Sequence, residues 1–297
     1  MLGRYATSDS PARWRTVLGT VLTLAFALVC LGLVPLVLVS SAQRGGGDTR
    51  TGSPGFVAEY GRAAPGGEGD RAFLADRRTL EKVADRLNRG LSVPGTVRMT
   101  GRSCGSTEVA YDPEHSRIDL CYEFVAEVRE QFENSGAGRA VAAKTAGVLV
   151  ETLYHEAGHA LIDKLQLPYT GREEDVADQF AAYSLIPQGE AGRRAILAAA
   201  ESYELYAADS DPAEFDFADE HAHDAARAVN YRAYLHGALR GAEGAEGAEG
   251  AEPREAGARR DAVLLPSARA DHAHFEYQDL RRGWDALLAP HRKPAGR

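Results

Sequence analysis

The strongest constraint on the fold of this 297-residue chain is a proline-free stretch, residues 141–166, that can be helical throughout. It carries the sequence H-E-A-G-H at residues 155–159. On a helix, His155 and His159 lie one turn apart and project from the same face. The stretch is apolar on most sides, which is typical of a buried helix. Burying two imidazoles and the carboxylate of Glu156 is unfavourable unless they are paired or bind a metal.

The motif has the residue types and spacing of a zinc site. Two imidazole nitrogens one turn apart can bind a single Zn²⁺, at about 2.0–2.1 Å each. Glu156 lies roughly 100° around the helix from His155, beside the open position of such a metal. It can take a proton from a zinc-bound water and pass it to a leaving amine. The alternative is a helix whose histidines only hydrogen-bond in the core.

A third ligand is expected from the next predicted helix, which starts near residue 172. Its first turn is acidic, as the helix dipole favours. Glu174 and Asp178 are four residues apart and share a face. We assign Glu174 to the metal, and we assign Asp178 to the ring nitrogen of His155 that faces away from the metal. A helix N-terminus with favourable charges and no ligand role is the alternative interpretation.

The H-E-x-x-H motif followed by E-x-x-x-D resembles the gluzincins, the thermolysin-like zinc peptidases. HEAGHALIDKLQLP and GREEDVADQFAAY also resemble a bacterial family of metallopeptidases, as do segments within residues 111–123, 219–227 and 265–288. This resemblance spans about residues 72–291, and it implies a zincin-like fold and a zinc-dependent peptidase. The family usually carries a further cysteine pair near its C-terminal helices, and that pair is absent here.

Peptide hydrolysis places negative charge on the carbonyl oxygen, which a cationic or hydrogen-bonding group stabilises. Thermolysin-like enzymes use a histidine or tyrosine from a later helix. In the predicted helix 217–239, His221 lies among carboxylates that favour its protonated form, and it aligns with a D-E-H pattern of the family. We predict His221 in this role, with Asp224 and Arg227 fixing it from the same helical face. His223, on another face, and a solvated acidic helix are the alternatives.

Short strands are predicted at residues 96–99, 107–111 and 117–122. Helices are predicted near residues 71–90, 123–135, 141–166, 172–186, 190–207, 217–239 and 267–289. Strands first and helices after imply a mostly helical α+β domain with a small antiparallel sheet. Peptidases of this class hold substrate along an edge strand. Where they carry Asn-Ala before an aromatic, this chain has residues 108–111 (EVAY) and lacks the Asn side chain.

Residues 17–39 form an uncharged apolar segment long enough to cross a bilayer, for which about 20 residues suffice. Three arginines precede it, which keeps residues 1–16 in the cytoplasm and the rest of the chain outside. We predict a single-pass membrane anchor and, after it, a flexible Gly- and Pro-rich linker at residues 40–70. The alternative is a secretory signal that is removed, leaving a secreted protein.

Cys104 and Cys121 are the cysteines outside the predicted anchor, and they flank a predicted hairpin. In an oxidising compartment they are expected to form a disulfide worth about 3 kcal/mol. Their spacing lacks the C-x-x-C character of a metal site. The domain is predicted to span residues 71–297, with a disordered acidic insertion at residues 241–258 that contains a G-A-E repeat.

The net charge of −9, without a basic stripe, argues against a nucleic-acid partner. Our main prediction is a membrane-anchored, extracytoplasmic zinc peptidase that acts on peptide or protein substrates. One alternative is a metal-stabilised, catalytically weak peptide- or protein-binding module of the cell envelope. Another is a zinc hydrolase of a different amide, such as a cell-wall peptide.

Overall fold

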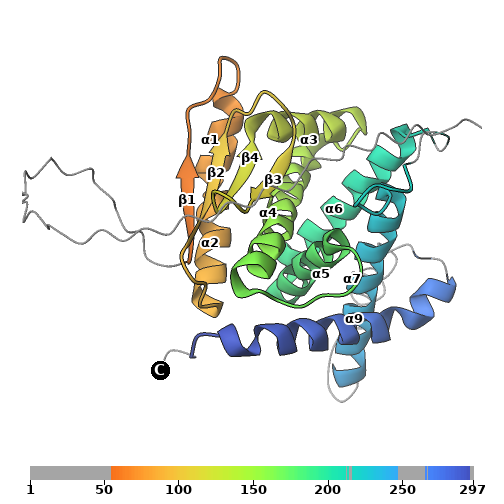
Figure 1. Ribbon diagram of the computed structural model, residues 1–297. Coiled ribbons are helices and arrows are strands. Elements are labelled where there is room, and N and C mark those ends of the chain that lie inside the picture. Colours follow the sequence, from red (N-terminus) through yellow and green to blue (C-terminus); the bar gives the residue numbers. More distant parts are fainter. Residues whose placement is uncertain (1–54, 212, 214–215, 247–264, 266, 295–297) are drawn as a thin grey trace, which may run out of the picture. The chain divides into compact units, whose positions relative to one another are not determined.

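The structure is a computed structural model that describes residues 55–294, apart from residues 212, 214–215, 247–264 and 266. A four-stranded sheet has the order β1-β2-β4-β3 (Figure 1). The strands are β1 (Gly55–Tyr60), β2 (Thr96–Arg102), β3 (Val109–Asp112) and β4 (Arg117–Cys121). β1 and β4 run parallel to β2, whereas β3 pairs antiparallel with β4. The sheet is therefore mixed, and β3 is an edge strand.

The prediction of an antiparallel sheet was wrong, because antiparallel pairing is confined to the β3–β4 hairpin of this sheet. The structure also differs from the predicted linker, since residues 55–60 form β1. Phe56 is buried, and the whole of β1 pairs with β2. A Gly- and Pro-rich composition over residues 40–70 does not reveal this strand, because one strand is stable only beside another.

The helices follow the predicted pattern closely. They are α1 (Glu68–Arg77), α2 (Thr79–Gly90), α3 (Tyr122–Asn134), α4 (Val141–Leu165), α5 (Glu173–Leu185), α6 (Glu190–Asp209), α7 (Asp224–Glu246) and α9 (Ser267–Leu288). The predicted helix 71–90 is two helices, separated by Arg78 in a left-handed conformation with φ of 51°. α7 begins at Asp224 instead of residue 217, and it includes residues 241–246 of the predicted insertion.

Helix α4 is the central element of the domain. It contacts β3 and β4 on one side and α5 and α6 on another, as Figure 1 shows. Leu149, Leu153 and Leu161 are fully buried in the shared core. Gly158 allows α5 to come close, because a Cβ atom there would lie 3.1 Å from the Cα atom of Ala177. This close approach sets α5 directly against the H-E-x-x-H segment.

Helix α9 closes the core against α5 and α7. Leu280, Trp284 and Leu288 are buried there. Among the described residues, no helix combines the length and apolarity needed to cross a membrane. The predicted anchor, residues 17–39, and residues 247–258 of the predicted insertion lie outside the described residues.

Candidate metal centre

The two histidines of the motif and Glu174 converge on one point. On α4, the Nε2 atoms of His155 and His159 lie 3.2 Å apart. From α5, Glu174 Oε2 lies 3.1 Å from His155 Nε2 and 3.3 Å from His159 Nε2. Tetrahedral ligands at about 2.0–2.1 Å from zinc are about 3.3 Å from one another. The separations of the three predicted ligand atoms therefore fit a single Zn²⁺.

The Nδ1 atom of each histidine is held by a carboxylate. His155 Nδ1 lies 2.8 Å from Asp178 Oδ1, and His159 Nδ1 lies 2.9 Å from Glu173 Oε1. These carboxylates fix a proton on each Nδ1 atom and leave the Nε2 lone pairs facing one another. Two lone pairs and a carboxylate oxygen at these distances repel unless a cation lies between them. The donor set thus fits a bound divalent metal, and zinc is among the ions that imidazole and carboxylate ligands suit.

Burial disfavours the charged imidazolium of His155, but hydrogen bonds with Asp178 and Glu174 outweigh burial and raise its pKa to about 10. Burial also disfavours the ionised form of Glu174, but its bonds with His155, His159 and His221 hold its pKa far below the usual range. The neighbours of His155 and Glu174 therefore favour the charged forms of both groups, and a metal bound to His155 would displace its proton.

Asp178 is held by partners from α7. Arg227 donates from Nε to Asp178 Oδ2 at 2.9 Å and from Nη2 to Oδ1 at 2.7 Å, and Tyr231 donates to Oδ1 at 3.1 Å. Burial opposes the charge on Asp178, but Arg227 and His155 outweigh burial and keep the pKa of this carboxyl low. Arg227 was predicted to fix His221, and that prediction was wrong. The Arg227 guanidinium instead keeps the Asp178 carboxylate ionised, and this carboxylate orients His155.

Two functional partners were missed in the sequence. Glu173 orients His159, and it accepts a hydrogen bond of 2.7 Å from the Tyr169 hydroxyl. Glu151 is 1% exposed and is hydrogen-bonded to Tyr231. Burial and the nearby Asp178 raise the pKa of Glu151 to about 7. Two features of the sequence could have indicated these partners. The Nδ1 atom of His159 had no assigned partner, and Glu151 is an acidic residue inside an apolar helix.

Glu151, His155 and Asp178 form a second group whose ligand atoms lie within 4.8 Å of one another. A cation there would meet the guanidinium of Arg227, which already binds Asp178 through two hydrogen bonds. Like charges at this separation repel strongly in a buried site. A metal therefore fits the position beside Glu174 better than the position among Glu151, His155 and Asp178.

Glu156 is 5% exposed and lines the same cleft as the proposed ligands. Burial raises the pKa of its carboxyl group, against the effect of His155 and His159. A raised pKa suits a group that must accept a proton and then release it near neutral pH.

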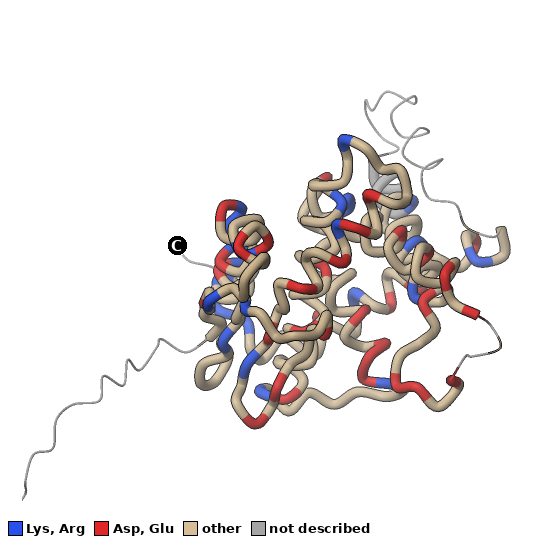
Figure 2. Tube along the Cα trace, turned by 90° about the horizontal axis from the view of Figure 1, so that it is seen from above, with Lys and Arg blue, Asp and Glu red and all other residues tan. Residues whose placement is uncertain are grey.

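The cleft has a volume of about 700 Å³ and lies between β3 and the start of α5. It is lined by carboxylates and, among the described residues, by no Lys or Arg; the acids are Glu108, Glu156, Asp163, Glu173, Glu174 and Glu220. Figure 2 shows acidic and basic residues interspersed along the described chain. A second pocket, of about 740 Å³, is lined by α5, α7 and α9 and contains no His or Cys.

His221 lies in the loop before α7 and not on the helix, because α7 begins at Asp224. The prediction that His221 and Asp224 share one face of a helix was therefore wrong. Two hydrogen bonds of the His221 backbone hold this loop. The His221 carbonyl accepts from Arg172 Nη1 at 3.0 Å, and the His221 N–H donates to Asp219 Oδ1 at 2.7 Å. The His221 ring stacks on that of His155, with centroids 6.4 Å apart, and its Nε2 lies 2.8 Å from Glu174 Oε2.

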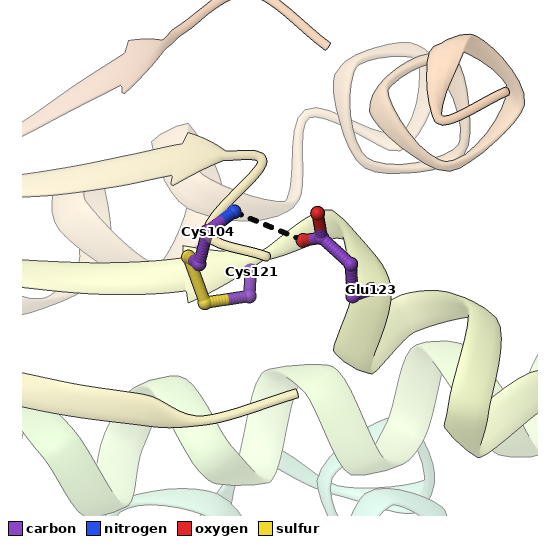
Figure 3. A group of neighbouring side chains, drawn as sticks. All are labelled: Cys104, Cys121 and Glu123. Atoms are coloured by element: carbon purple, nitrogen blue, oxygen red, sulfur yellow. Dashed lines mark hydrogen bonds between the residues drawn. A yellow bond between two sulfur atoms is a disulfide. The ribbon is translucent and has the colours of Figure 1, made fainter. Parts of the chain in front are cut away.

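Cys104 and Cys121 are joined by a disulfide next to Glu123 (Figure 3). The Glu123 carboxylate accepts hydrogen bonds from the backbone N–H groups of Cys104 and Gly105, at 3.1 and 3.2 Å. The three side chains meet the distance requirement of a metal site, but disulfide sulfurs are not thiolate ligands. The pair therefore ties the loop after β2 to the end of β4.

An H-E-x-x-H helix beside a small mixed sheet, with a carboxylate from the following helix, defines a metal-dependent hydrolase centre. A family model described as "Putative metallopeptidase" matches residues 63–288. The match covers most of the chain and the whole candidate centre, and the chain belongs to this metallopeptidase family. The comparisons with curated proteins and with solved structures gave no match.

Proposed function

We propose that this protein is a zinc peptidase of the gluzincin type, anchored in the cell membrane with its catalytic domain outside the cytoplasm. One observation carries the proposal. His155, His159 and Glu174 present three ligand atoms at separations of 3.1 to 3.3 Å, with Glu156 in the adjoining cleft. Two nitrogens and one oxygen are the ligand set of catalytic zinc in this class.

When bound, zinc polarises a water molecule and a peptide carbonyl. The chain's own groups perform the remaining tasks. Glu156 accepts a proton from the attacking water and delivers it to the leaving amine. Asp178 and Glu173 keep both imidazole rings oriented. His221 can donate a hydrogen bond to the carbonyl oxygen as negative charge develops there.

The edge strand β3 supports a peptide or protein substrate. Glu108, Val109, Ala110 and Tyr111 line the cleft beside the centre. An extended peptide can pair with free main-chain groups of such an edge, and this pairing does not depend on side chains. The acids of the cleft favour substrates with positive charge near the scissile bond.

The location outside the cytoplasm is supported by two features. Residues 17–39 are apolar and follow three arginines. The disulfide between Cys104 and Cys121 suits an oxidising compartment. Cell fractionation of the full chain tests the anchor, and protease added to intact cells tests the side. Recovery of the domain in the cytosolic fraction would contradict this part of the proposal.

The catalytic proposal is tested with Glu156→Gln, which keeps the size of the side chain and removes the base. We expect the variant to retain zinc and to lose hydrolysis of a peptide library by about 100- to 10,000-fold. Glu133→Gln, on an exposed part of α3, is the matched control and should behave as wild type. Chelator should abolish wild-type cleavage and added zinc should restore it. Full activity of Glu156→Gln would contradict the mechanism.

A second candidate is a peptide-binding module that zinc stabilises without efficient catalysis. The position of His221 beside the proposed ligands favours it, because this imidazole can block the position that water needs. The module would bind peptides from the same library at a zinc-dependent affinity and leave them intact. Cleavage that depends on zinc and on Glu156 would reject it.

A further inference from the structure

His221 brings a third imidazole to the proposed metal ligands. Its Nε2 atom lies 2.8 Å from Glu174 Oε2, which is shorter than the 3.1 Å separation between His155 and the same oxygen. His155, Glu174 and His221 each offer one ligand atom, and the three atoms lie within 4.8 Å of one another. His221 therefore satisfies the same distance requirement as a ligand.

An ion pair between His221 and Glu174 does not by itself explain this arrangement. Glu174 Oε2 is also within 3.3 Å of the Nε2 atoms of both His155 and His159. Three imidazole nitrogens thus surround one carboxylate oxygen, which has only two lone pairs. A divalent ion among these four side chains would bind all of their donor atoms without competition for protons.

We infer that His221 is a fourth, displaceable ligand of the metal, which closes the site in the resting protein. This inference rests on the proposed zinc site. Zinc with four protein ligands is typical of structural sites, whereas a catalytic site keeps one position open for water. Binding by His221 would close that position, and substrate entering the cleft would have to displace the imidazole before hydrolysis begins.

The local structure allows the ring to leave while the backbone stays in place. The His221 side chain is 43% exposed, in contrast to 7% for His155 and 13% for His159. Its backbone is fixed by Arg172 and by Asp219. Rotation about χ1 can therefore move the ring off the metal, within the cleft, without unfolding an element. The Nδ1 atoms of His155 and His159 lie 2.8 and 2.9 Å from carboxylate oxygens, closer than the 3.4 Å between His221 Nδ1 and Asp219 Oδ1, so the rings on α4 are held more tightly.

The inference is tested by X-ray absorption at the zinc edge and by chelator competition on the full chain. In the absorption spectrum, wild type should show three imidazole ligands and His221→Ala should show two. In the chelator competition, His221→Ala should bind zinc about 10- to 100-fold more weakly than wild type. His223→Ala is the matched control in the same loop. Its ring packs against Phe217, and it belongs to none of the metal-capable groups among the described residues, so it should match wild type.

His221→Cys provides a readout that does not depend on activity or on the stability of the alanine variant. A thiolate at this position should add a sulfur at about 2.3 Å to the zinc spectrum. No sulfur shell in His221→Cys, together with unchanged ligand number and affinity in His221→Ala, would overturn the inference and leave the zinc site standing. Failure of wild type to bind zinc would instead refute the proposed function itself.

Discussion

At the scale of single residues, the centre is governed by which nitrogen of each histidine carries the proton. Asp178 and Glu173 accept from the Nδ1 atoms and turn both Nε2 atoms toward Glu174. The acids behind the histidines therefore orient the proposed ligands, although they would not touch the metal themselves. Partners of this kind commonly change metal affinity by about 10- to 100-fold.

Removal of the acid behind His159 tests this role. We expect Glu173→Ala to weaken zinc binding by about 10- to 100-fold, because the ring loses the partner that fixes its tautomer. Chelator competition measures the change. Glu190→Ala, at the exposed start of α6, is the control and should leave zinc affinity unchanged. Equal affinities for Glu173→Ala and wild type would show that Tyr169 or solvent can replace the carboxylate.

Glu151 predicts a pH-dependent stability. Its pKa is raised from 4.5 to about 7 by burial and by Asp178, so the folded protein holds this proton more tightly than the unfolded chain does. The resulting stability is present below about pH 4.5 and is lost as the pH rises through 7. Glu151→Gln mimics the protonated acid. The melting temperature of Glu151→Gln should rise relative to that of wild type as the pH increases from 5 to 8. A difference in melting temperature that stays constant over this range would contradict the raised pKa.

At the scale of elements, the centre depends on three helices, α4, α5 and α7, which all contribute side chains to it. α4 carries the histidines, α5 carries Glu174 and Asp178, and α7 reaches back with Arg227 and Tyr231. Gly158 permits the contact between α4 and α5. The bond between Asp178 and Arg227 joins α5 to α7 inside the protein, where an unpaired charge is unfavourable.

Arg227→Met tests the connection between these helices. It leaves the Asp178 charge buried without its cation, and we expect a loss of about 3–5 kcal/mol in the free energy of unfolding. Urea denaturation measures this loss. Arg194→Met, on α6, removes an ion pair with Glu190 in which both side chains are more than half exposed, and it should cost less than about 1 kcal/mol. Similar losses for the two variants would indicate that the buried pair contributes no more than a surface pair.

At the scale of the whole molecule, the sheet and the helices of the described domain share one core, to which the strands contribute Met99, Ile118 and Leu120. The Cys104–Cys121 disulfide joins the loop after β2 to β4, next to the edge strand β3 that borders the cleft. It restricts the unfolded chain and fixes the end of the hairpin. The predicted location outside the cytoplasm would allow this bond to persist.

Replacement of both cysteines, Cys104→Ser with Cys121→Ser, tests the contribution of the disulfide. We expect the free energy of unfolding to fall by about 3 kcal/mol for a closed loop of this size. Zinc affinity should be retained, since neither sulfur belongs to the proposed centre. Denaturant titration and metal competition on the same samples measure both quantities. A variant as stable as wild type would show that the hairpin is already held by its other contacts.

The sequence by itself predicted most of the helices and the residues of the proposed three-ligand set. Apolar periodicity and residue spacing are local properties, so His155, Glu156, His159, Glu174 and Asp178 could be selected before any contact was known. Only the tertiary structure decided that β1 joins the sheet in parallel, that Arg227 binds Asp178, and that His221 approaches Glu174 from a loop. These contacts join residues far apart in the chain. Their formation depends on how elements pack, which local patterns do not encode.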